Sequence, residues 1–336
     1  MLVITGGGGF IGSVLGAALN EAGRSDIVIV DHFGASDKWR NIAKRDFSDI
    51  VPVEGLSAWL ERNGNEVEAV FHLGANSSTF ADDADEIIAT NLNSSIALWR
   101  WCAAAGKKLI YASSAATYGD GAAGFDDGGG IEALKRLRPL NLYGWSKHAF
   151  DLWAMREAAA GHAPPLWVGL KFFNVFGPNE YHKGEMMSLV VKNYRDIAAG
   201  RTIRLFKSHR SDYADGEQRR DFVYVKDCAA VMLWAWRHGT GTDHPTGGDI
   251  NGVYNLGSGE ARSFLDLMNA TGAACGVAPR IEFIDIPPVI RPSYQYFTEA
   301  KMSRLRQAGY NAPFTPLEDA VRDCVTQYLA KADPYL

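Results

Sequence analysis

The first half of the chain alternates short apolar runs with longer segments whose apolar positions recur at helical spacing. The short runs predict strands at Leu2–Thr5, Ile27–Val30, Ala69–Leu73, Lys108–Ala112 and Leu166–Phe173. The longer segments predict helices at Ile11–Ala22, Ile87–Ala105 and Tyr143–Ala160. Short apolar strands separated by helices are typical of a parallel sheet covered on both faces. We therefore predict an α/β fold with a doubly wound parallel sheet.

The second half is less regular and contains more loops, proline and glycine. It predicts strands at Ile203–Phe206 and Ile281–Ile286, helices at Met186–Ala199, Lys226–Arg237, Phe264–Thr271 and Pro316–Lys331, and surface loops at Lys207–Gln218 and Thr240–Gly252. We expect a dinucleotide-binding domain at residues 1–170 and a smaller, mixed α/β substrate-binding domain within residues 171–336. Returns to the first domain are expected near residues 220–236 and 253–258, with strands at Phe222–Val225 and Tyr254–Leu256.

Composition and charge exclude several classes of protein. The 336 residues suit one large or two interleaved domains, and the net charge of -5 gives no basic surface for nucleic acid. The four cysteines lack metal-ligand spacing and fit a reducing compartment. No apolar run reaches membrane-spanning length, and we expect no signal peptide, because the first predicted strand starts at residue 2. We expect a cytoplasmic protein that holds no metal and binds neither nucleic acid nor membranes.

A glycine-rich loop follows the first predicted strand directly. Gly6, Gly9 and Gly12 recur at intervals of three, with Phe10 and Ile11 between the last two. Glycine lets a turn close and lets backbone N–H groups approach a phosphate, while the N-terminus of the following helix adds partial positive charge. The motif counts as evidence here because it lies between a strand and a helix. It predicts that these five residues bind the pyrophosphate of a dinucleotide in a Rossmann-type domain.

A second motif carries the candidate chemistry. Tyr143 and Lys147 lie four residues apart on a predicted helix and therefore share one face. A neighbouring ammonium favours the phenolate of tyrosine, and the same lysine can donate to a cofactor ribose. Ser114 follows the predicted strand Lys108–Ala112, where its hydroxyl can bind a substrate oxygen or merely cap a turn. We predict Ser114, Tyr143 and Lys147 as catalytic residues.

These motifs, taken in order, resemble the extended short-chain dehydrogenase/reductase family of nucleotide-sugar epimerases and dehydratases. The resemblance rests on Thr5–Gly12, Ser113–Gly119, Tyr143–Lys147, Phe173–Pro178, Arg220–Asp227 and Asn255–Gly259. Within the family, the chain is most similar to the branch that inverts C6 of ADP-heptoses, on the residues His72–Ser78, Tyr111–Gly119, His182–Gly184, Tyr294–Thr298 and Leu305–Tyr310. The resemblance spans nearly the whole chain.

The resemblance implies oxidation at C6 of an ADP-sugar, reorientation, and return of the same hydride to the opposite face. Such a scheme needs a proton-transfer group on each side of C6. Tyr143 is the first, and Lys183 matches the second, although a lysine there could instead bind phosphate or face solvent. The substrate-binding residues implied are Ser114, Asn174, Val175, Glu185, Lys192, Phe206, Arg220 and Tyr294. The family also implies a homo-oligomer.

The choice of cofactor depends on the end of the second predicted strand. Asp31 stands there, and an acid at this position binds the ribose 2′-hydroxyl of NAD. The resemblance nonetheless implies NADP, with Lys38 beside the acid. We therefore expect NADP, with NAD as the alternative. Further cofactor contacts implied by the resemblance are His32, Leu73, Gly74, Ala75, Asn91, Tyr143 and Lys147.

Several positions depart from the family pattern and leave the exact substrate open. Val53 stands where a cofactor-binding lysine is expected, Glu185 replaces a small serine and Lys192 replaces a histidine. Lys207–His209 likewise replaces a Glu-Gly-Ser run. The catalytic residues match while the substrate contacts differ, so the sugar and the nucleotide are less certain than the chemistry.

Alternative activities differ in the residues they require. A 4,6-dehydratase needs an Asp-Glu pair where this chain has Ala115 and Ala116, and a 3,5-epimerase/reductase needs a cysteine near Ser114. A C4 epimerase remains possible because it needs only the serine, the tyrosine and Lys147; Lys183 would then be idle. A non-catalytic nicotinamide-binding module is disfavoured because Tyr143 and Lys147 are both present.

Overall fold

A seven-stranded sheet in which every neighbouring pair is parallel forms the centre of the computed structural model, which describes residues 1–238, 249–288, 290–291 and 294–336. Its order is β10-β6-β5-β4-β1-β2-β3. The strands are β1 (Leu2–Thr5), β2 (Ile27–Val30), β3 (Asp49–Val51), β4 (Ala69–His72), β5 (Lys108–Ser114), β6 (Trp167–Phe172) and β10 (Gly252–Leu256). In register, Thr5 lies between Val30 and His72, so the carboxyl ends of β1, β2 and β4 are level.

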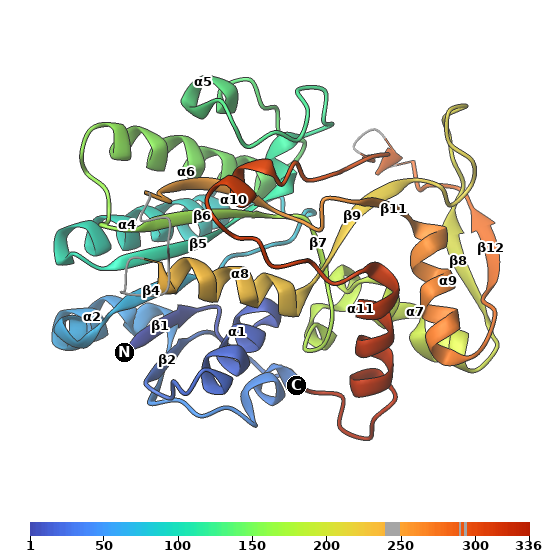
Figure 1. The fold of residues 1–336 in the computed structure, drawn as a ribbon, viewed down its shortest axis with the longest axis horizontal. Helices are drawn as coiled ribbons and strands as arrows, with labels where there is room; N and C mark the ends of the chain where they lie inside the picture. Colours follow the sequence, from blue (N-terminus) through green and yellow to red (C-terminus); the bar gives the residue numbers. More distant parts are fainter. Residues whose placement is uncertain (239–248, 289, 292–293) are drawn as a thin grey trace.

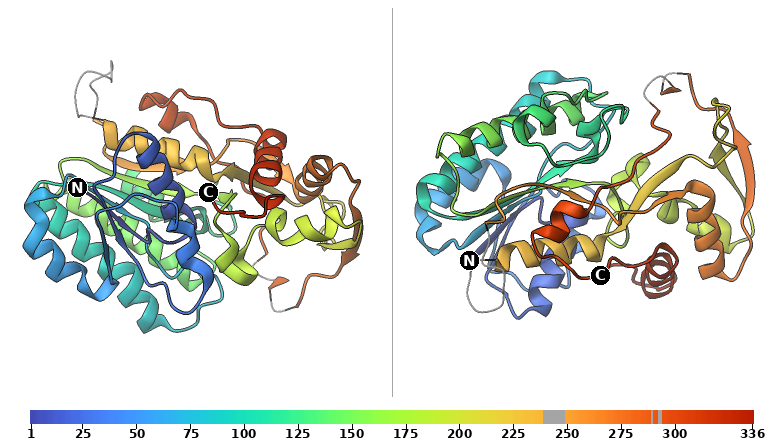
Figure 2. Two further views of the ribbon diagram at one scale, coloured as in Figure 1. Left: turned by 90° about the horizontal axis from the view of Figure 1, so that it is seen from below. Right: turned by 45° about the horizontal axis from the view of Figure 1, so that its top comes forward.

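Helices cover both faces of this sheet, as Figures 1 and 2 show. One layer holds α1 (Phe10–Glu21) and α8 (Val225–Arg237), and the other holds α2 (Leu56–Asn63), α4 (Ser94–Ala105) and α6 (Leu142–Ala159). Alternate residues of a strand point to opposite faces. Accordingly, Leu2 and Ile4 of β1 join the core under α1 and α8, whereas Val3 joins the core under α2, α4 and α6. Each face therefore has its own apolar core.

The remaining elements form a smaller part of the molecule beyond the carboxyl ends of the sheet, at the right of Figure 1. Its strands are β7 (Asn174–Phe176), β9 (Arg219–Tyr224) and β11 (Ala261–Ser263) in one sheet, and β8 (Thr202–Phe206) and β12 (Arg280–Ile284) in another. Its helices are α7 (Leu189–Ala198), α9 (Phe264–Cys275) and α11 (Leu317–Asp323). The short helices α3 (Ala84–Ile87), α5 (Gly130–Leu134) and α10 (Ser303–Gln307) lie in connecting segments.

The predicted doubly wound sheet is confirmed, and several predicted elements need correction. The strand at Lys108–Ala112 continues to Ser114, and the helix at Ile87–Ala105 begins three residues earlier and contains a π-helical turn between α3 and α4. Strand β3 and helix α2 were not predicted. Strand β3 has only three residues, two of them exposed, and therefore carries little apolar pattern. Most of the loop predicted at 240–252 lies outside the described residues.

The strand predicted at Phe222–Val225 does not return to the large sheet. It forms β9, which pairs with β7 and β11 in the three-stranded sheet. The helix that follows, α8, does return and packs against α1. Strand β10 pairs with β6 at the edge of the large sheet, as predicted for Tyr254–Leu256. The two strands join different sheets because of the path that the chain takes between the two parts of the molecule, and no local sequence pattern distinguishes them.

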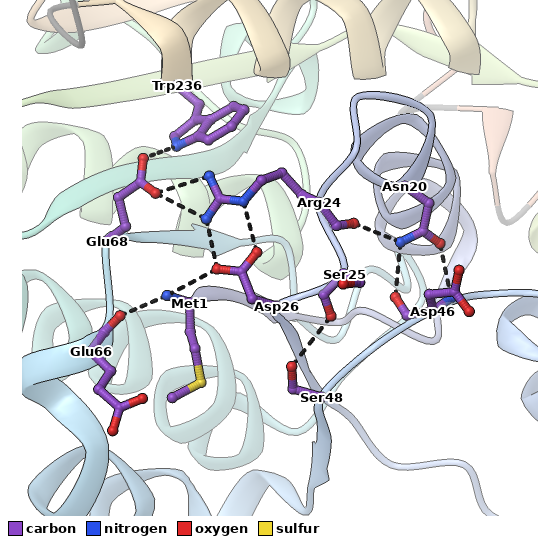
Figure 3. Close-up of polar contacts among 10 residues, drawn as sticks. All are labelled: Met1, Asn20, Arg24, Ser25, Asp26, Asp46, Ser48, Glu66, Glu68 and Trp236. Atoms are coloured by element: carbon purple, nitrogen blue, oxygen red, sulfur yellow. Dashed lines mark hydrogen bonds and ion pairs between the residues drawn. The ribbon is translucent and has the colours of Figure 1, made fainter.

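A polar cluster ties several elements together at the amino end of the sheet (Figure 3). Arg24 forms ion pairs with Asp26 at 2.7 Å and with Glu68 at 3.0 Å. Glu68 also accepts a hydrogen bond of 2.7 Å from the indole of Trp236 on α8. These contacts fix α8 against the sheet at the end opposite the carboxyl ends of its strands. Among the described residues, no helix combines the length and apolarity needed to cross a bilayer.

Candidate active site

A cavity of about 570 Å³ lies at the carboxyl ends of the parallel strands, between the large sheet and the smaller part of the molecule. In open parallel sheets this edge is where ligands bind. Sixteen of the predicted site residues line the cavity: Gly6, Gly9, Phe10, Ile11, Gly12, Asp31, Lys38, Leu73, Gly74, Ala75, Ser114, Tyr143, Lys147, Asn174, Val175 and Lys183. The fold thus brings together candidate cofactor, catalytic and substrate residues that are far apart in the sequence.

The glycine loop is closed so tightly that side chains would not fit. A Cβ atom on Gly12 would lie 2.2 Å from the carbonyl oxygen of Gly6, and Gly6 itself has a φ of +69°. Gly9 stands at the N-cap of α1, so no side chain covers the first N–H groups of this helix. Free N–H groups and the helix dipole favour a bound anion. The loop therefore fits the pyrophosphate of a dinucleotide.

Asp31 at the end of β2 is already bonded on both oxygens. Its Oδ2 accepts from the backbone N–H of Gly8 at 2.8 Å, and its Oδ1 accepts from Lys38 Nζ at 2.6 Å. The ammonium compensates the carboxylate, which reduces the repulsion of a phosphate bound nearby. The ring of His32 is exposed, pairs with Glu54 at 3.0 Å and does not line the cavity, and the cofactor contact predicted for His32 stays a prediction.

Helix α6 carries the predicted tyrosine and lysine. The helix begins after Asn141, whose side chain accepts from the N–H of Gly144 at 2.8 Å. Burial raises the pKa of Tyr143, and a hydrogen bond with the Ser114 hydroxyl lowers it. Burial lowers the pKa of Lys147 to about 8. Tyr143 is thus hydrogen-bonded to Ser114, and the protonation of Tyr143 and Lys147 depends on this environment.

The two strand-end serines have different partners. The hydroxyl of Ser113 donates to Asp151 at 2.7 Å inside the protein. The oxygen of Ser114 accepts from the N–H of Ala116 at 3.1 Å, and its hydroxyl is hydrogen-bonded to Tyr143, which lines the cavity. Of the two, Ser114 is thus the one suited to donate to a substrate oxygen.

Lys183 reaches the cavity from the opposite part of the molecule. It lies in the short 3-10 segment Tyr181–Met186, and its Nζ is 5.1 Å from the ring centroid of Phe10. Burial lowers the pKa of Lys183, and the nearby carboxylate of Glu180 raises it. Tyr143 and Lys183 therefore enter one cavity from two different elements. Two such groups can move protons at two positions of a bound ligand.

Asn91 acts behind the cavity rather than in its wall. It is buried, its Oδ1 accepts from the N–H of Asn76 at 2.8 Å, and its Nδ2 donates to Ser146 at 3.1 Å. It braces the loop after β4 against helix α6. Asn91 does not line the cavity, and the cofactor contact predicted for it stays a prediction.

Five predicted substrate contacts do not line the cavity. Glu185 and Lys192 form an exposed ion pair at 2.9 Å. Arg220 is buried and stacks on Tyr294 and on Phe264, at 5.4 and 5.5 Å from the ring centroids. The ring centroid of Phe206 lies 5.9 Å from that of Tyr294. Arg220, Tyr294 and Phe206 thus form a connected group that adjoins the cavity residue Phe264, and the substrate contacts predicted for them stay predictions.

The structure adds cavity residues that the sequence did not reveal. They are Ser77, Thr79, Ala112, Ser113, Ala115, Ala116, Phe172, Phe173, Phe176, His182, Met186, Met187, Ser188, Leu189, Phe222, Phe264, Leu267, Gln295 and Thr298. Several adjoin predicted residues: His182 precedes Lys183, and Gln295 follows Tyr294. The position of His182 depends on Asn41, whose amide donates to Gly8 O at 2.9 Å and contacts His182 Nδ1 at 3.2 Å. Sequence offers no signal for contacts across such separations.

The described part of the chain contains no cluster of three or more His, Cys, Asp or Glu side chains suited to a metal ion. The charged groups of the cavity are instead Asp31, Lys38, Lys147 and Lys183. The arrangement suits an anionic dinucleotide and proton transfer by tyrosine and lysine.

Comparisons with known proteins agree with this geometry. Residues 2–257 match the model of the NAD dependent epimerase/dehydratase family. Over the full length of both chains, the protein is 46% identical to the ADP-L-glycero-D-manno-heptose-6-epimerase of Nitratidesulfovibrio vulgaris (strain DP4) and 44% identical to that of Fusobacterium nucleatum. A crystal structure of the Helicobacter pylori enzyme of that name is similar, with a TM-score of 0.76, 25% identity and coverage of 97% and 95% of the two chains. The chain belongs to the NAD dependent epimerase/dehydratase family and is a nucleotide-sugar epimerase.

Proposed function

We propose that the protein inverts C6 of an ADP-glycero-manno-heptose by transient oxidation and re-reduction with bound NADP. One observation carries the proposal: the glycine loop, the Ser114–Tyr143–Lys147 set and Lys183 line a single cavity. The full-length relatives named for heptose 6-epimerisation support the choice of reaction. The TM-score and the 25% identity to the Helicobacter pylori enzyme support it further.

The chain's own residues divide the work between binding and proton transfer. The loop of Gly6, Gly9 and Gly12 would hold the pyrophosphate, and Lys147 would hold the nicotinamide ribose. When bound, the nicotinamide accepts a hydride from C6 and returns it. Tyr143 would take the C6 hydroxyl proton at its phenolic oxygen while Ser114 donates to the same substrate oxygen.

Inversion requires the second half of the reaction to occur on the other face of C6. After the sugar end reorients, the carbonyl formed at C6 needs a proton donor on its new side. Lys183 would supply that proton, because it enters the cavity from the segment opposite helix α6. Its burial favours proton loss, since the pKa of Lys183 is lowered by desolvation.

The preference for NADP rests on the pairing of Asp31 with Lys38. An unpaired carboxylate would repel a 2′-phosphate, whereas the 2.6 Å contact with the Lys38 ammonium compensates its charge. NAD stays the alternative, because an acid at this position can also accept from a ribose hydroxyl. The homo-oligomeric state and the cytoplasmic location stay predictions from the sequence.

A C4 epimerase acting on a UDP-sugar is the second candidate. It would use Ser114, Tyr143 and Lys147 in the same way, but it would leave Lys183 without a role. The position of Lys183 in the cavity, with Glu180 as a nearby counter-charge, favours the C6 reaction, because only that reaction uses a second proton-transfer group there.

Incubation with ADP-D-glycero-D-manno-heptose, followed by proton NMR of the C6 configuration, tests the proposal directly, with UDP-glucose in a parallel sample. We expect inversion of the heptose and no change in UDP-glucose. Tyr143→Phe should lower kcat by about 10²- to 10⁴-fold, the usual contribution of a general acid-base group. Lys183→Met should slow inversion to a similar degree, whereas Lys135→Met, at an exposed ion pair, should have no effect. Wild-type rates in the first two variants, or conversion of UDP-glucose alone, would contradict the proposal.

A further inference from the structure

A buried ion pair lies directly behind the candidate catalytic residues. Asp151 and Lys171 meet at 2.6 Å, and neither side chain is exposed at all. Asp151 follows Lys147 by four residues, so Tyr143, Lys147 and Asp151 form one row along α6. Lys171 lies on β6, where it pairs in register with Ser113 of β5. The pair therefore joins the catalytic helix to the strand that carries the serines.

The partners of the pair hold the strand end on both sides of Ser114. Asp151 accepts hydrogen bonds from the Ser113 hydroxyl at 2.7 Å and from the Tyr111 hydroxyl at 3.1 Å. Lys171 donates to the hydroxyl of Thr117 at 2.7 Å, and that hydroxyl donates to the carbonyl oxygen of Ser114 at 2.8 Å. The side chain of Ser113 and the carbonyl group of Ser114 are thus both held by hydrogen bonds.

Stability alone does not account for such a pair. Removing two charges from water costs about as much as their attraction returns, and apolar residues of the same volume often serve equally well. The ion pair also uses three hydroxyl groups as hydrogen-bond partners. A contribution to the neighbouring site is the physical reason to keep it.

The charge of Asp151 acts on both groups of the catalytic row. Among the described residues, Asp151 is the one whose charge raises the pKa of Lys147, against the effect of burial. The same charge raises the pKa of Tyr143. The positive charge of Lys171, on β6, is compensated by the carboxylate of Asp151.

The other elements around Lys147 present neutral groups. His72 of β4 is uncharged because burial and the charge of Lys147 lower its pKa to about 3, and its ring is bonded to Thr5 at 2.7 Å and to Ser95 at 2.9 Å. Strand β5 presents serine hydroxyls. His148, the next residue on α6, has its pKa lowered by burial first and by Lys171 and Arg138 as well, while Asp151 raises it. Asp151 is thus the carboxylate that opposes the effect of burial on the pKa of Lys147 and adds to that effect on the pKa of Tyr143.

We propose that Asp151, held in place by Lys171, is a positioning residue that keeps Lys147 charged and orients Ser114 toward the cavity. The inference rests on the proposed function, because it assigns Lys147 and Ser114 their roles in the same reaction. It adds that the pH range of the enzyme is set from behind the site, by a carboxylate that does not line the cavity.

The test is the pH profile of kcat in the double variant Asp151→Asn/Lys171→Met, which leaves no uncompensated buried charge. Loss of the carboxylate lowers the pKa of both Lys147 and Tyr143, and loss of the Lys171 ammonium offsets part of this effect, so both limbs of the profile should move to lower pH. Tyrosinate absorbance during an alkaline titration, as a difference from a Tyr143→Phe background, reads the same shift without turnover. Lys171→Arg, which keeps both charges, should retain the wild-type profile.

The matched control is Asp196→Asn/Arg201→Met, a pair at the same 2.6 Å distance but with side chains 44% and 60% exposed. It should leave the profile unchanged. An unshifted profile in the buried double variant, or an equal loss of rate at every pH, would show a merely structural role and overturn the inference. If the double variant does not fold, Asp151→Asn/Lys171→Gln, which also leaves no uncompensated buried charge, gives the same comparison. Full activity of Tyr143→Phe would instead contradict the proposed function, so the two failures are distinguishable.

Discussion

We expect alanine at Gly12 and alanine at Gly16 to have opposite effects, although both lie on α1 one turn apart. A Cβ on Gly12 would stand 2.2 Å from the carbonyl oxygen of Gly6, whereas a Cβ on Gly16 would meet no atom within 4 Å. The same substitution on the same helix therefore separates the steric demand of the glycine loop from helix propensity.

The magnitudes follow from these contacts. Gly16→Ala should stabilise the protein by about 1 kcal/mol, the propensity difference between glycine and alanine inside a helix. Gly12→Ala gains the same amount but has to open the Gly6 contact by about 1 Å, and such overpacking costs about 1–3 kcal/mol. The shifted loop also loses a hydrogen bond to the phosphate, and about 1.5–3 kcal/mol per charged bond corresponds to roughly 10- to 100-fold weaker cofactor binding.

Urea unfolding of the two variants and titration with NADP measure both effects. Gly16→Ala should show a raised midpoint and wild-type cofactor affinity. Gly12→Ala should show a lowered or unchanged midpoint together with the loss of affinity. If Gly12→Ala is as stable as Gly16→Ala and binds NADP as tightly as the wild type, the loop is not the phosphate site.

Two further predictions concern buried polar groups. The pKa of Lys147 is about 8 in the folded chain and 10.5 in the unfolded chain, so the unfolded chain binds the extra proton between these values. In the cofactor-free protein, Lys147→Met should raise the urea midpoint at pH 7, and this advantage should shrink as pH rises from about 8 to 10.5; a constant difference would contradict the lowered pKa. Asn41→Leu removes the bonds to Gly8 and His182 and should destabilise the protein by about 1–3 kcal/mol while weakening NADP binding, as titration calorimetry would show. Unchanged binding would mean that this contact does not organise the cavity.

Local pattern determined much of the fold. Strands β1 and β2 have the limits that their apolar runs predict, and the glycine loop lies where its spacing predicts. Tyr143 and Lys147 share a helix face because a spacing of four residues has that consequence in any α-helix. These features depend on neighbours within about one turn or one strand, so the sequence encodes them directly.

Tertiary structure decided which distant residues meet. Lys183 lies near Phe10 because the chain crosses between the two parts of the molecule. Asp151 meets Lys171 because α6 packs on the large sheet, whose register fixes the position of Lys171. The same path stacks Arg220 on Phe264, which lines the cavity, and leaves Glu185 exposed. The sequence by itself thus determined the nucleotide loop, the helix face and the family chemistry. The composition of the cavity depended on long-range packing, which local periodicity does not specify.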